Sequence, residues 1–217
     1  MNYFCKLKIK NRGFTRTPKS LMSGFTLTEL IVVMAIATVI MTSIVIQQSK
    51  WNDQLVVSTQ AYEMSLMIRQ AQIYALGVRE NVAGTGDKFD VAYGINFDIT
   101  SPTQYVFFVD KNKSGKLDSE ESLETKSLTR EVYIQKICAF IPPKAKCSDL
   151  GVLSKVSVTF LRPSPNAIIK LLTSSNQEVA AYEPPAIIHL LSPKGVKFYL
   201  RIESSGQIYI GTGEPVQ

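Results

Sequence analysis

The feature that most constrains this 217-residue chain is an uncharged apolar run near its N-terminus. Residues 30–46 read LIVVMAIATVIMTSIVI, and residues 25–28 extend the run across one acidic residue, Glu29. A helix needs about 20 mostly apolar residues to cross the hydrocarbon core of a membrane. The run therefore predicts a transmembrane helix over 25–47. An ionised carboxylate at the edge of such a span is costly without a partner, so Glu29 needs an explanation.

A secretory signal peptide is the alternative interpretation of the same run. Its apolar core usually has about 7 to 15 residues and ends at a small-residue cleavage site. The run here is longer and continues into QQSKWNDQ, which contains no such site. The pattern favours a membrane-spanning segment, although an anchor that is never processed remains open.

The net charge of +6 comes entirely from a basic leader, residues 1–24. Six of the 24 Lys and Arg residues lie there and none of the 18 acidic residues does, so residues 25–217 have equal numbers of both charges. Because basic residues flank membrane spans on the cytoplasmic side, this predicts a cytoplasmic N-terminus and an outward-facing bulk. The six are Lys6, Lys8, Lys10, Arg12, Arg16 and Lys19.

The helix is expected to continue beyond the membrane, over 25–77. No Gly or Pro occurs between 25 and 76, and Gly77 is the first helix-breaking residue. In the extracytoplasmic half, 48–77, a mostly apolar stripe recurs at helical spacing and predicts a face that packs on another element. The stripe consists of Leu55, Tyr62, Leu66, Arg69 and Ile73.

Residues 78–217 predict a β-rich globular domain. Short β-branched and aromatic runs alternate there with turn residues, and the segment 195–211 reads as a hairpin that turns near Ser205 and Gly206. The expected fold class is α+β, with the long helix packed on a mostly antiparallel sheet. The expected strands are 91–97, 105–109, 131–137, 152–161, 167–172, 186–191, 196–202 and 207–210.

The N-terminal segment resembles the type IV pilin and type II secretion pseudopilin superfamily. The resemblance rests on the basic leader, on GFTLTEL with Gly24, Phe25 and Glu29, and on the apolar run after it. It implies that a prepilin peptidase cuts after Gly24 and methylates the new N-terminus at Phe25. It also implies a partner for Glu29, because the amino group of Phe25 in a neighbouring subunit could neutralise the carboxylate during assembly. The alternative is that Glu29 lies in the headgroup layer or neutralises its own N-terminus.

Departures from the family pattern favour a minor subunit. Thr28 stands where many members have Ile, and Ile46 lies in the region where major pilins often have a helix-breaking Pro. The β region looks more like the minor pilins and pseudopilins of the GspH and FimT type. The resemblance implies other pilin or pseudopilin subunits, the peptidase, an inner-membrane assembly platform and membrane lipid as partners, with the pilus or pseudopilus as the final location.

The segment 110–121, DKNKSGKLDSEE, matches a calcium-loop template with one substitution, Ser114. A structural Ca²⁺ of millimolar affinity is the candidate cofactor, and no cofactor is required; a polar turn that binds nothing is the alternative. The candidate ligands are Asp110, Asn112, Ser114, the carbonyl of Lys116, Asp118 and Glu121, with Gly115 at the turn position.

Two cysteines remain beyond the leader, Cys138 and Cys147. They could form a disulfide in an oxidising compartment, or remain unpaired thiols. The sequence gives little support for catalysis, because the only histidine, His189, lies in the apolar run AIIHLL and is expected to be a core or sheet-face residue. We therefore expect a structural protein and not an enzyme.

A binding module at a pilus tip is the alternative function. Nucleic acid is an unfavoured ligand because residues 25–217 carry no excess of positive charge. Basic residues that could nevertheless contact phosphate are Arg162, Lys170, Lys194, Lys197 and Arg201.

Overall fold

The computed structural model describes residues 24–77, 91–141, 144–148, 152–179 and 183–214. The chain divides into two compact units, residues 1–45 and 46–217. The predicted leader, 1–24, lies outside the described residues except for Gly24.

The predicted long helix is confirmed as α1 (Leu27–Leu76), an element of 50 residues. Thr26 directly precedes it, and the Thr26 carbonyl accepts the first helical hydrogen bond from the Leu30 N–H at 3.2 Å. It ends where the Gly77 N–H donates to the Ile73 carbonyl at 2.8 Å. Within the first unit, every described side chain of α1 is exposed.

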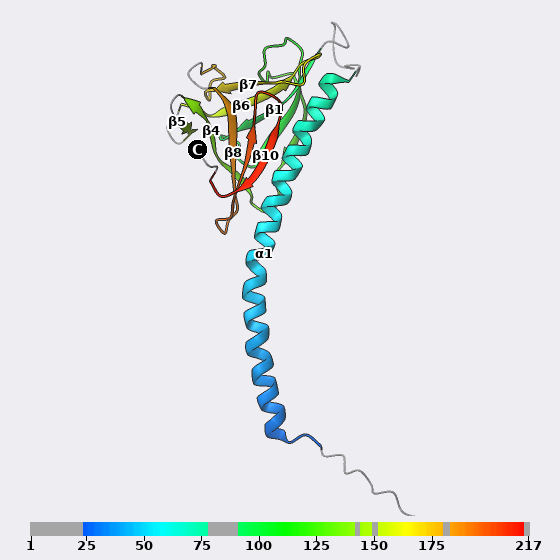
Figure 1. Cartoon of the computed structure of the whole chain (residues 1–217), viewed down its shortest axis with the longest axis vertical. Coiled ribbons are helices and arrows are strands. Elements are labelled where there is room, and N and C mark those ends of the chain that lie inside the picture. The colour runs from blue at the N-terminus through cyan, green and yellow to red at the C-terminus, as the bar shows by residue number, and fades with distance from the viewer. Residues whose placement is uncertain (1–23, 78–90, 142–143, 149–151, 180–182, 215–217) are drawn as a thin grey trace, which may run out of the picture. The chain divides into compact units, whose positions relative to one another are not determined.

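The second unit contains two antiparallel sheets of five strands each (Figure 1). The first has the order β3-β2-β1-β6-β7 and the second the order β10-β9-β8-β4-β5. The helix and the two sheets confirm the predicted α+β fold class. The strands are β1 (Ala92–Asp98), β2 (Gln104–Asp110), β3 (Ser122–Ser127), β4 (Tyr133–Ile141), β5 (Lys144–Cys147), β6 (Lys155–Phe160), β7 (Ala167–Leu172), β8 (Glu183–Leu191), β9 (Lys197–Ile202) and β10 (Ile208–Thr212).

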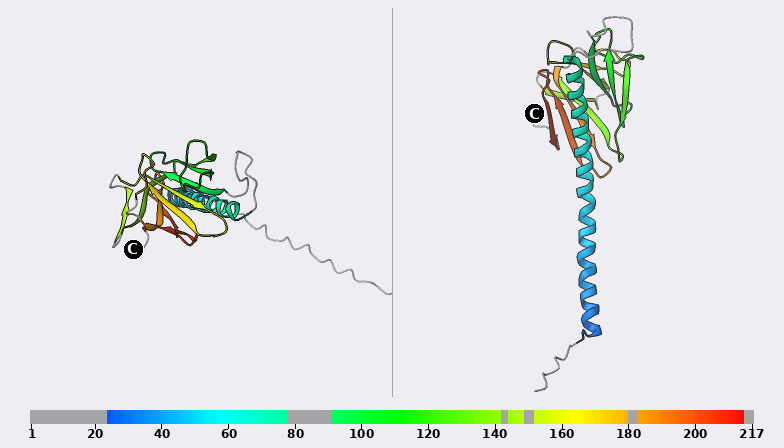
Figure 2. Two further views of the ribbon diagram at one scale, coloured as in Figure 1. Left: turned by 90° about the horizontal axis from the view of Figure 1, so that it is seen from above. Right: turned by 90° about the vertical axis from the view of Figure 1, so that its right-hand side faces the viewer.

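One hydrophobic core joins the outer half of α1 to both sheets. Figures 1 and 2 show this half of the helix running alongside the strands. Alternate side chains of β1, β2 and β6 enter this core from the first sheet, and those of β4, β8 and β9 enter it from the second. The helix contributes side chains at three- and four-residue spacing, half of them alanines that let the backbone approach the strands closely. These are Val57, Ala61, Met64, Ile68, Ala71 and Ala75.

Three hydrogen bonds between described residues fasten α1 to the loops around the sheets. The Ser192 hydroxyl donates to Asp53 at 2.7 Å, the Thr129 N–H donates to the Gln60 side chain at 3.1 Å, and the Gln72 amide donates to the Pro165 carbonyl at 2.9 Å. Because these bonds are spread along the outer half of the helix, they fix which of its faces is turned to the core.

The predicted apolar stripe is not the face that packs inside the chain. Leu55, Tyr62, Leu66 and Ile73 are 59–66% exposed, and Arg69 is exposed too. Thr59 and Leu76 lie on the same exposed face, so steps of four and three residues run from 55 to 76. The outer half of α1 therefore has two apolar faces, and only one of them is covered within the described part of the chain.

The strand predictions were mostly correct, with local errors. β3 and β5 were missed, and β4 begins at Tyr133 because Arg130 and Glu131 have φ angles of 53° and 59°, which no strand allows. The predicted hairpin is confirmed as β9 and β10, with Gly206 at its turn and a φ of 82°.

Candidate functional site

The segment Gly24–Glu29 lies at the exposed start of α1. A Cβ added at Gly24 would meet no atom within 4 Å, and Gly24 is not among the described residues with positive φ. Neither the packing nor the backbone conformation requires glycine at this position. The described structure therefore gives no reason for glycine at position 24.

Thr26 caps the N-terminus of α1, and Glu29 lies at the acidic position of a capping-box sequence. The Glu29 N–H donates to the Thr26 hydroxyl at 3.2 Å, and the order Thr-x-x-Glu is that of a capping box. An acidic residue in the first turn also interacts favourably with the positive end of the helix dipole, by about 0.3–1 kcal/mol. This role of Glu29 was not predicted, although the Thr-x-x-Glu pattern before an apolar run is visible in the sequence.

The first half of α1 is apolar enough to cross a membrane. It contains an 18-residue window of mean hydropathy 2.5, and no part of that window is buried. Among the described residues this is the one helix with such a window. An uncovered apolar surface of this length requires a nonaqueous environment, either lipid or other helices.

A pocket of about 280 Å³ lies beside the exposed stripe of α1. It is lined by Leu55 and Thr59 of the stripe, by Glu63, and by Thr129 and Arg130 of the loop before β4. The stripe is thus an exposed surface with a hollow at one end.

The loop 110–121 folds back on the first sheet and has the turn that a calcium loop needs. Asp110 is 1% exposed, and its carboxylate accepts hydrogen bonds from the N–H groups of Ser114 at 2.9 Å and Gly115 at 2.7 Å. Gly115 has a φ of 72°, which suits glycine. Burial raises the pKa of Asp110, and the charges of Glu121 and Asp118 raise it further.

The other candidate ligands bond within the same loop. The Asn112 amide donates to Asp118 at 2.8 Å, and Glu121, which is 5% exposed, accepts from the backbone N–H groups of Lys111 and Asp118. The described residues contain no group of three or more His, Cys, Asp or Glu side chains placed to hold a metal ion. Metal binding would therefore depend on the amide, hydroxyl and carbonyl groups of the loop as well, or on movement of the carboxylates.

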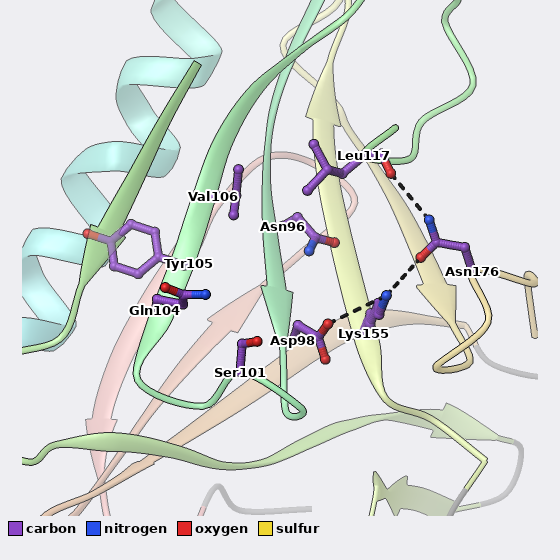
Figure 3. Close-up of a pocket in the computed structure, with 9 residues that line it drawn as sticks. All are labelled: Asn96, Asp98, Ser101, Gln104, Tyr105, Val106, Leu117, Lys155 and Asn176. Atoms are coloured by element: carbon purple, nitrogen blue, oxygen red, sulfur yellow. Dashed lines mark hydrogen bonds and ion pairs between the residues drawn. The ribbon is translucent and has the colours of Figure 1, made fainter. Parts of the chain in front are cut away.

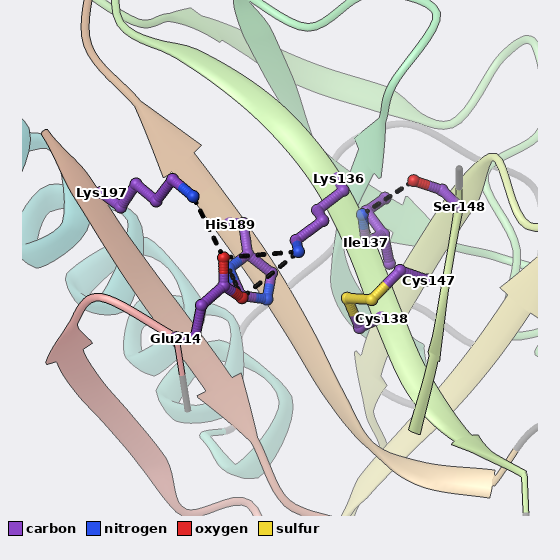
Figure 4. The surroundings of a disulfide bond; sticks show 8 residues. All are labelled: Lys136, Ile137, Cys138, Cys147, Ser148, His189, Lys197 and Glu214. Carbon is purple, nitrogen blue, oxygen red and sulfur yellow. Dashed lines mark hydrogen bonds and ion pairs between the residues drawn. A yellow bond between two sulfur atoms is a disulfide. The ribbon is translucent and has the colours of Figure 1, made fainter. Parts of the chain in front are cut away.

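Cys138 and Cys147 are directly opposite each other on β4 and β5 and are joined by a disulfide (Figure 4). Next to this bond, the Ile137 N–H donates to the Ser148 hydroxyl at 3.1 Å. The disulfide ties the short edge strand β5 to β4. The hydrogen bond from Ile137 ties Ser148, the residue after β5, to β4 as well.

His189 is buried on the side of β8 opposite the core. In the sheet register, His189 pairs with Lys136 of β4 and with Tyr199 of β9. The Glu214 carboxylate lies over His189 and forms ion pairs with Lys136 at 3.2 Å and Lys197 at 3.3 Å (Figure 4). Within the described part of the chain, Glu214 is the acidic residue within ion-pair distance of His189.

Four of the basic residues considered for phosphate contact lie beside carboxylates. Lys170 contacts Glu178 at 2.7 Å, Lys194 contacts Asp53 at 3.5 Å, Lys197 contacts Glu214 at 3.3 Å, and Arg201 contacts Glu203 at 2.7 Å. Their positive charge is locally balanced, which weakens the hypothesis of a nucleic-acid surface.

Comparison with known proteins identifies the N-terminal segment. Residues 19–45 match the family model described as the prokaryotic N-terminal methylation motif. This motif, followed by the long apolar helix, supports a type IV pilin-like or pseudopilin protein, points to a structural subunit and fits anchoring in the inner membrane. No curated protein and no solved structure matches the chain.

Proposed function

We propose that this chain is a minor pilin or pseudopilin, an assembly subunit of a type IV pilus or a type II secretion pseudopilus. It enters the inner membrane as a single-pass protein with its N-terminus in the cytoplasm. A prepilin peptidase cuts it after Gly24 and methylates Phe25, and an assembly platform then adds it to a fibre outside the cytoplasm. The observation that carries this proposal is the methylation motif at residues 19–45, continuous with a helix that leaves one apolar face uncovered.

The uncovered face supplies the contact surface for a neighbouring helix. Its residues recur in steps of four and three from Leu55 to Leu76, which is the spacing of a seam between two long helices. At the N-terminal end, the Glu29 carboxylate pairs with the amino group of Phe25 in the next subunit. An ion pair at one end and an apolar seam along the helix together determine the axial position of each subunit.

The proposal is tested by the N-terminal mass of the protein from cells with and without an active prepilin peptidase. A chain that begins with methylated Phe25 only when the peptidase is active supports it. A chain that keeps residues 1–24 in both strains contradicts it, and Glu29 then has its capping role alone.

A binding module at the tip of a pilus is the second candidate, and it shares the same anchor. DNA is the ligand for which basic surface residues could be recruited, but Lys170, Lys194, Lys197 and Arg201 all have acidic neighbours. Measurable DNA affinity that falls steeply with salt concentration would favour this candidate. Absence of binding at low salt would eliminate DNA as the ligand.

We also propose that the loop 110–121 binds Ca²⁺ as a structural ion. The support is the match of Asp110, Asn112, Ser114, Asp118 and Glu121 to the ligand spacing, together with the left-handed turn at Gly115. Burial of two carboxylates in one loop also favours a cation, because unneutralised buried charge is costly. The ion stabilises the loop against the sheet.

A further inference from the structure

A small polar pocket lies on the outer face of the first sheet, next to the loop 110–121 (Figure 3). Its volume is about 140 Å³, well above the roughly 10–15 Å³ that one water molecule needs by the same measure. It is smaller than the roughly 300–1,000 Å³ usual for drug-sized ligands. The pocket therefore suits one small polar molecule or one residue of a larger chain.

The side-chain amide of Asn96 opens into this pocket. Asn96 on β1 is only 6% exposed, and its Oδ1 accepts a hydrogen bond from the Ser157 hydroxyl at 2.8 Å. Figure 3 shows its Nδ2 atom pointing into the space between the lining side chains, and this atom is not among the buried side-chain atoms that lack a hydrogen-bond partner in the described part of the chain. The Nδ2 group can therefore donate to a hydrogen-bonding molecule in the pocket.

The charged groups of the pocket balance each other. Lys155 lies 3.5 Å from the Asp98 carboxylate and also donates to the Asn176 side chain at 3.1 Å. The Asn176 amide donates in turn to the Leu117 carbonyl at 3.2 Å, which fastens the loop 110–121 to the rim. The pocket thus has fixed walls and no net charge, so it favours a neutral ligand.

The remaining lining groups have the chemistry that recognises hydroxyl groups. Gln104 and Ser101 each present donors and acceptors beside the Asn96 amide, and Val106 and Leu117 provide an apolar wall. A sugar ring has hydroxyl groups that donate and accept along its edge, and C–H groups on its faces. We propose that this pocket binds a single neutral sugar residue. The proposal does not depend on the assembly function, although a fibre subunit would display the site outside the cell.

Titration of the full-length, ¹⁵N-labelled protein with neutral monosaccharides tests this proposal by NMR. The detergent must be zwitterionic, because sugar-based detergents would compete for the pocket. Glucose, galactose, mannose and N-acetylglucosamine serve as probes, with gluconate as the charged comparison. We expect saturable shifts of the Asn96 side-chain amide signals with at least one neutral sugar. Asn96→Ala should weaken binding about 3- to 10-fold, as loss of one hydrogen bond predicts.

Asn166→Ala is the matched control, because Asn166 is exposed and lies outside the pocket. It should leave the affinity unchanged. No response to any of the neutral sugars, an equal loss of affinity in both variants, or binding of gluconate alone would overturn the proposal. If Asn96→Ala does not fold, Gln104→Ala at the half-buried rim replaces it, with the same expected loss and the same control.

Discussion

The Nδ1 atom of His189 lies 3.8 Å from the Oε2 atom of Glu214, yet it has no hydrogen-bond partner among the described residues. Burial lowers the pKa of His189, and Lys136 and Lys197 lower it further, whereas Glu214 raises it. The effect of burial on the His189 pKa is larger than that of Glu214, because the Glu214 carboxylate is half-exposed and solvent screens its charge. The folded chain therefore favours the neutral imidazole.

This arrangement predicts a pH dependence of stability. The unfolded chain protonates His189 at the ordinary pKa near 6.5, whereas the folded chain protonates it only at a lower pH. The stability that His189 contributes is complete above pH 6.5 and is lost as the pH falls through the lowered pKa. His189→Gln should reduce the loss of stability in that window, as measured by chemical denaturation. Because His189 is the only histidine, NMR can follow its titration directly, and a pKa of 6.5 or more would contradict the prediction.

Truncation of two residues that are close in sequence but lie on opposite faces of α1 should affect different properties, folding stability for one and assembly for the other. Ile68 is fully buried, so Ile68→Ala should lower the free energy of unfolding by about 2–5 kcal/mol. Leu66 is 63% exposed, so Leu66→Ala should change it by less than about 0.5 kcal/mol but reduce incorporation into fibres. Denaturation of the purified protein and the amount recovered in sheared fibres measure the two effects. Normal assembly of the Leu66 variant would show that the stripe is not the contact surface.

Conservative variants can separate the proposed ion pair of Glu29 from the capping of α1. Glu29→Gln keeps a capping-box side chain and loses only the charge, whereas Thr26→Ala removes the cap and keeps the charge. If the carboxylate pairs with a neighbouring amino group, Glu29→Gln should impair assembly more than Thr26→Ala does. Both variants should still be cleaved after Gly24. Quantification of processed and fibre-bound protein provides the measurement, and the reverse order would assign Glu29 to capping.

Calcium should raise the melting temperature if it binds the loop 110–121. For a dissociation constant of about 1 mM, roughly 10 mM Ca²⁺ adds about 1.4 kcal/mol, or roughly 3–6 °C for this chain. Asp110→Asn should abolish the increase, while Glu120→Gln, an exposed neighbour outside the ligand pattern, should preserve it. The increase should diminish in acid as Asp110, whose pKa is raised, becomes protonated. An equal effect of Mg²⁺ would point to ionic strength instead.

Loss of the disulfide should destabilise the second unit. Cys138 and Cys147 are nine residues apart, and the chain-entropy model predicts a cost of about 2–3 kcal/mol for Cys147→Ser. Denaturation with and without a reductant measures it. The double variant Cys138→Ser, Cys147→Ser serves as the control, because its stability should not respond to the reductant. A wild-type protein that is equally indifferent to reduction would mean that the thiols are unpaired in solution.

The helix was predictable because its signals are local. The absence of Gly and Pro before Gly77 placed its end to within a residue, and the apolar run placed its start at residue 25, two residues before the observed Leu27. Its packing face was not predictable. Three alanines, Ala61, Ala71 and Ala75, make the buried face less hydrophobic in the sequence than the exposed stripe, so the stripe was the more conspicuous pattern.

The missed strands share a physical reason. β3 has no buried residue, and β5 is a four-residue strand rich in lysine, as is common for edge strands that must not pair with other chains. The first residues of β8 include Pro184 and Pro185, which argue against a strand. The polar pocket could not be predicted at all, because it depends on β1, β6 and the loop 110–121 meeting in space.

The cap of α1 has a consequence for the timing of maturation. Thr26 and Glu29 both lie on the C-terminal side of the Gly24–Phe25 bond, so a cut there severs none of the helix hydrogen bonds between described residues. Removal of the leader would then change the charge and the terminus without refolding the helix. The segment that inserts in the membrane would be structurally ready for the fibre before the peptidase acts, and cleavage would act as a release signal and not as a folding step.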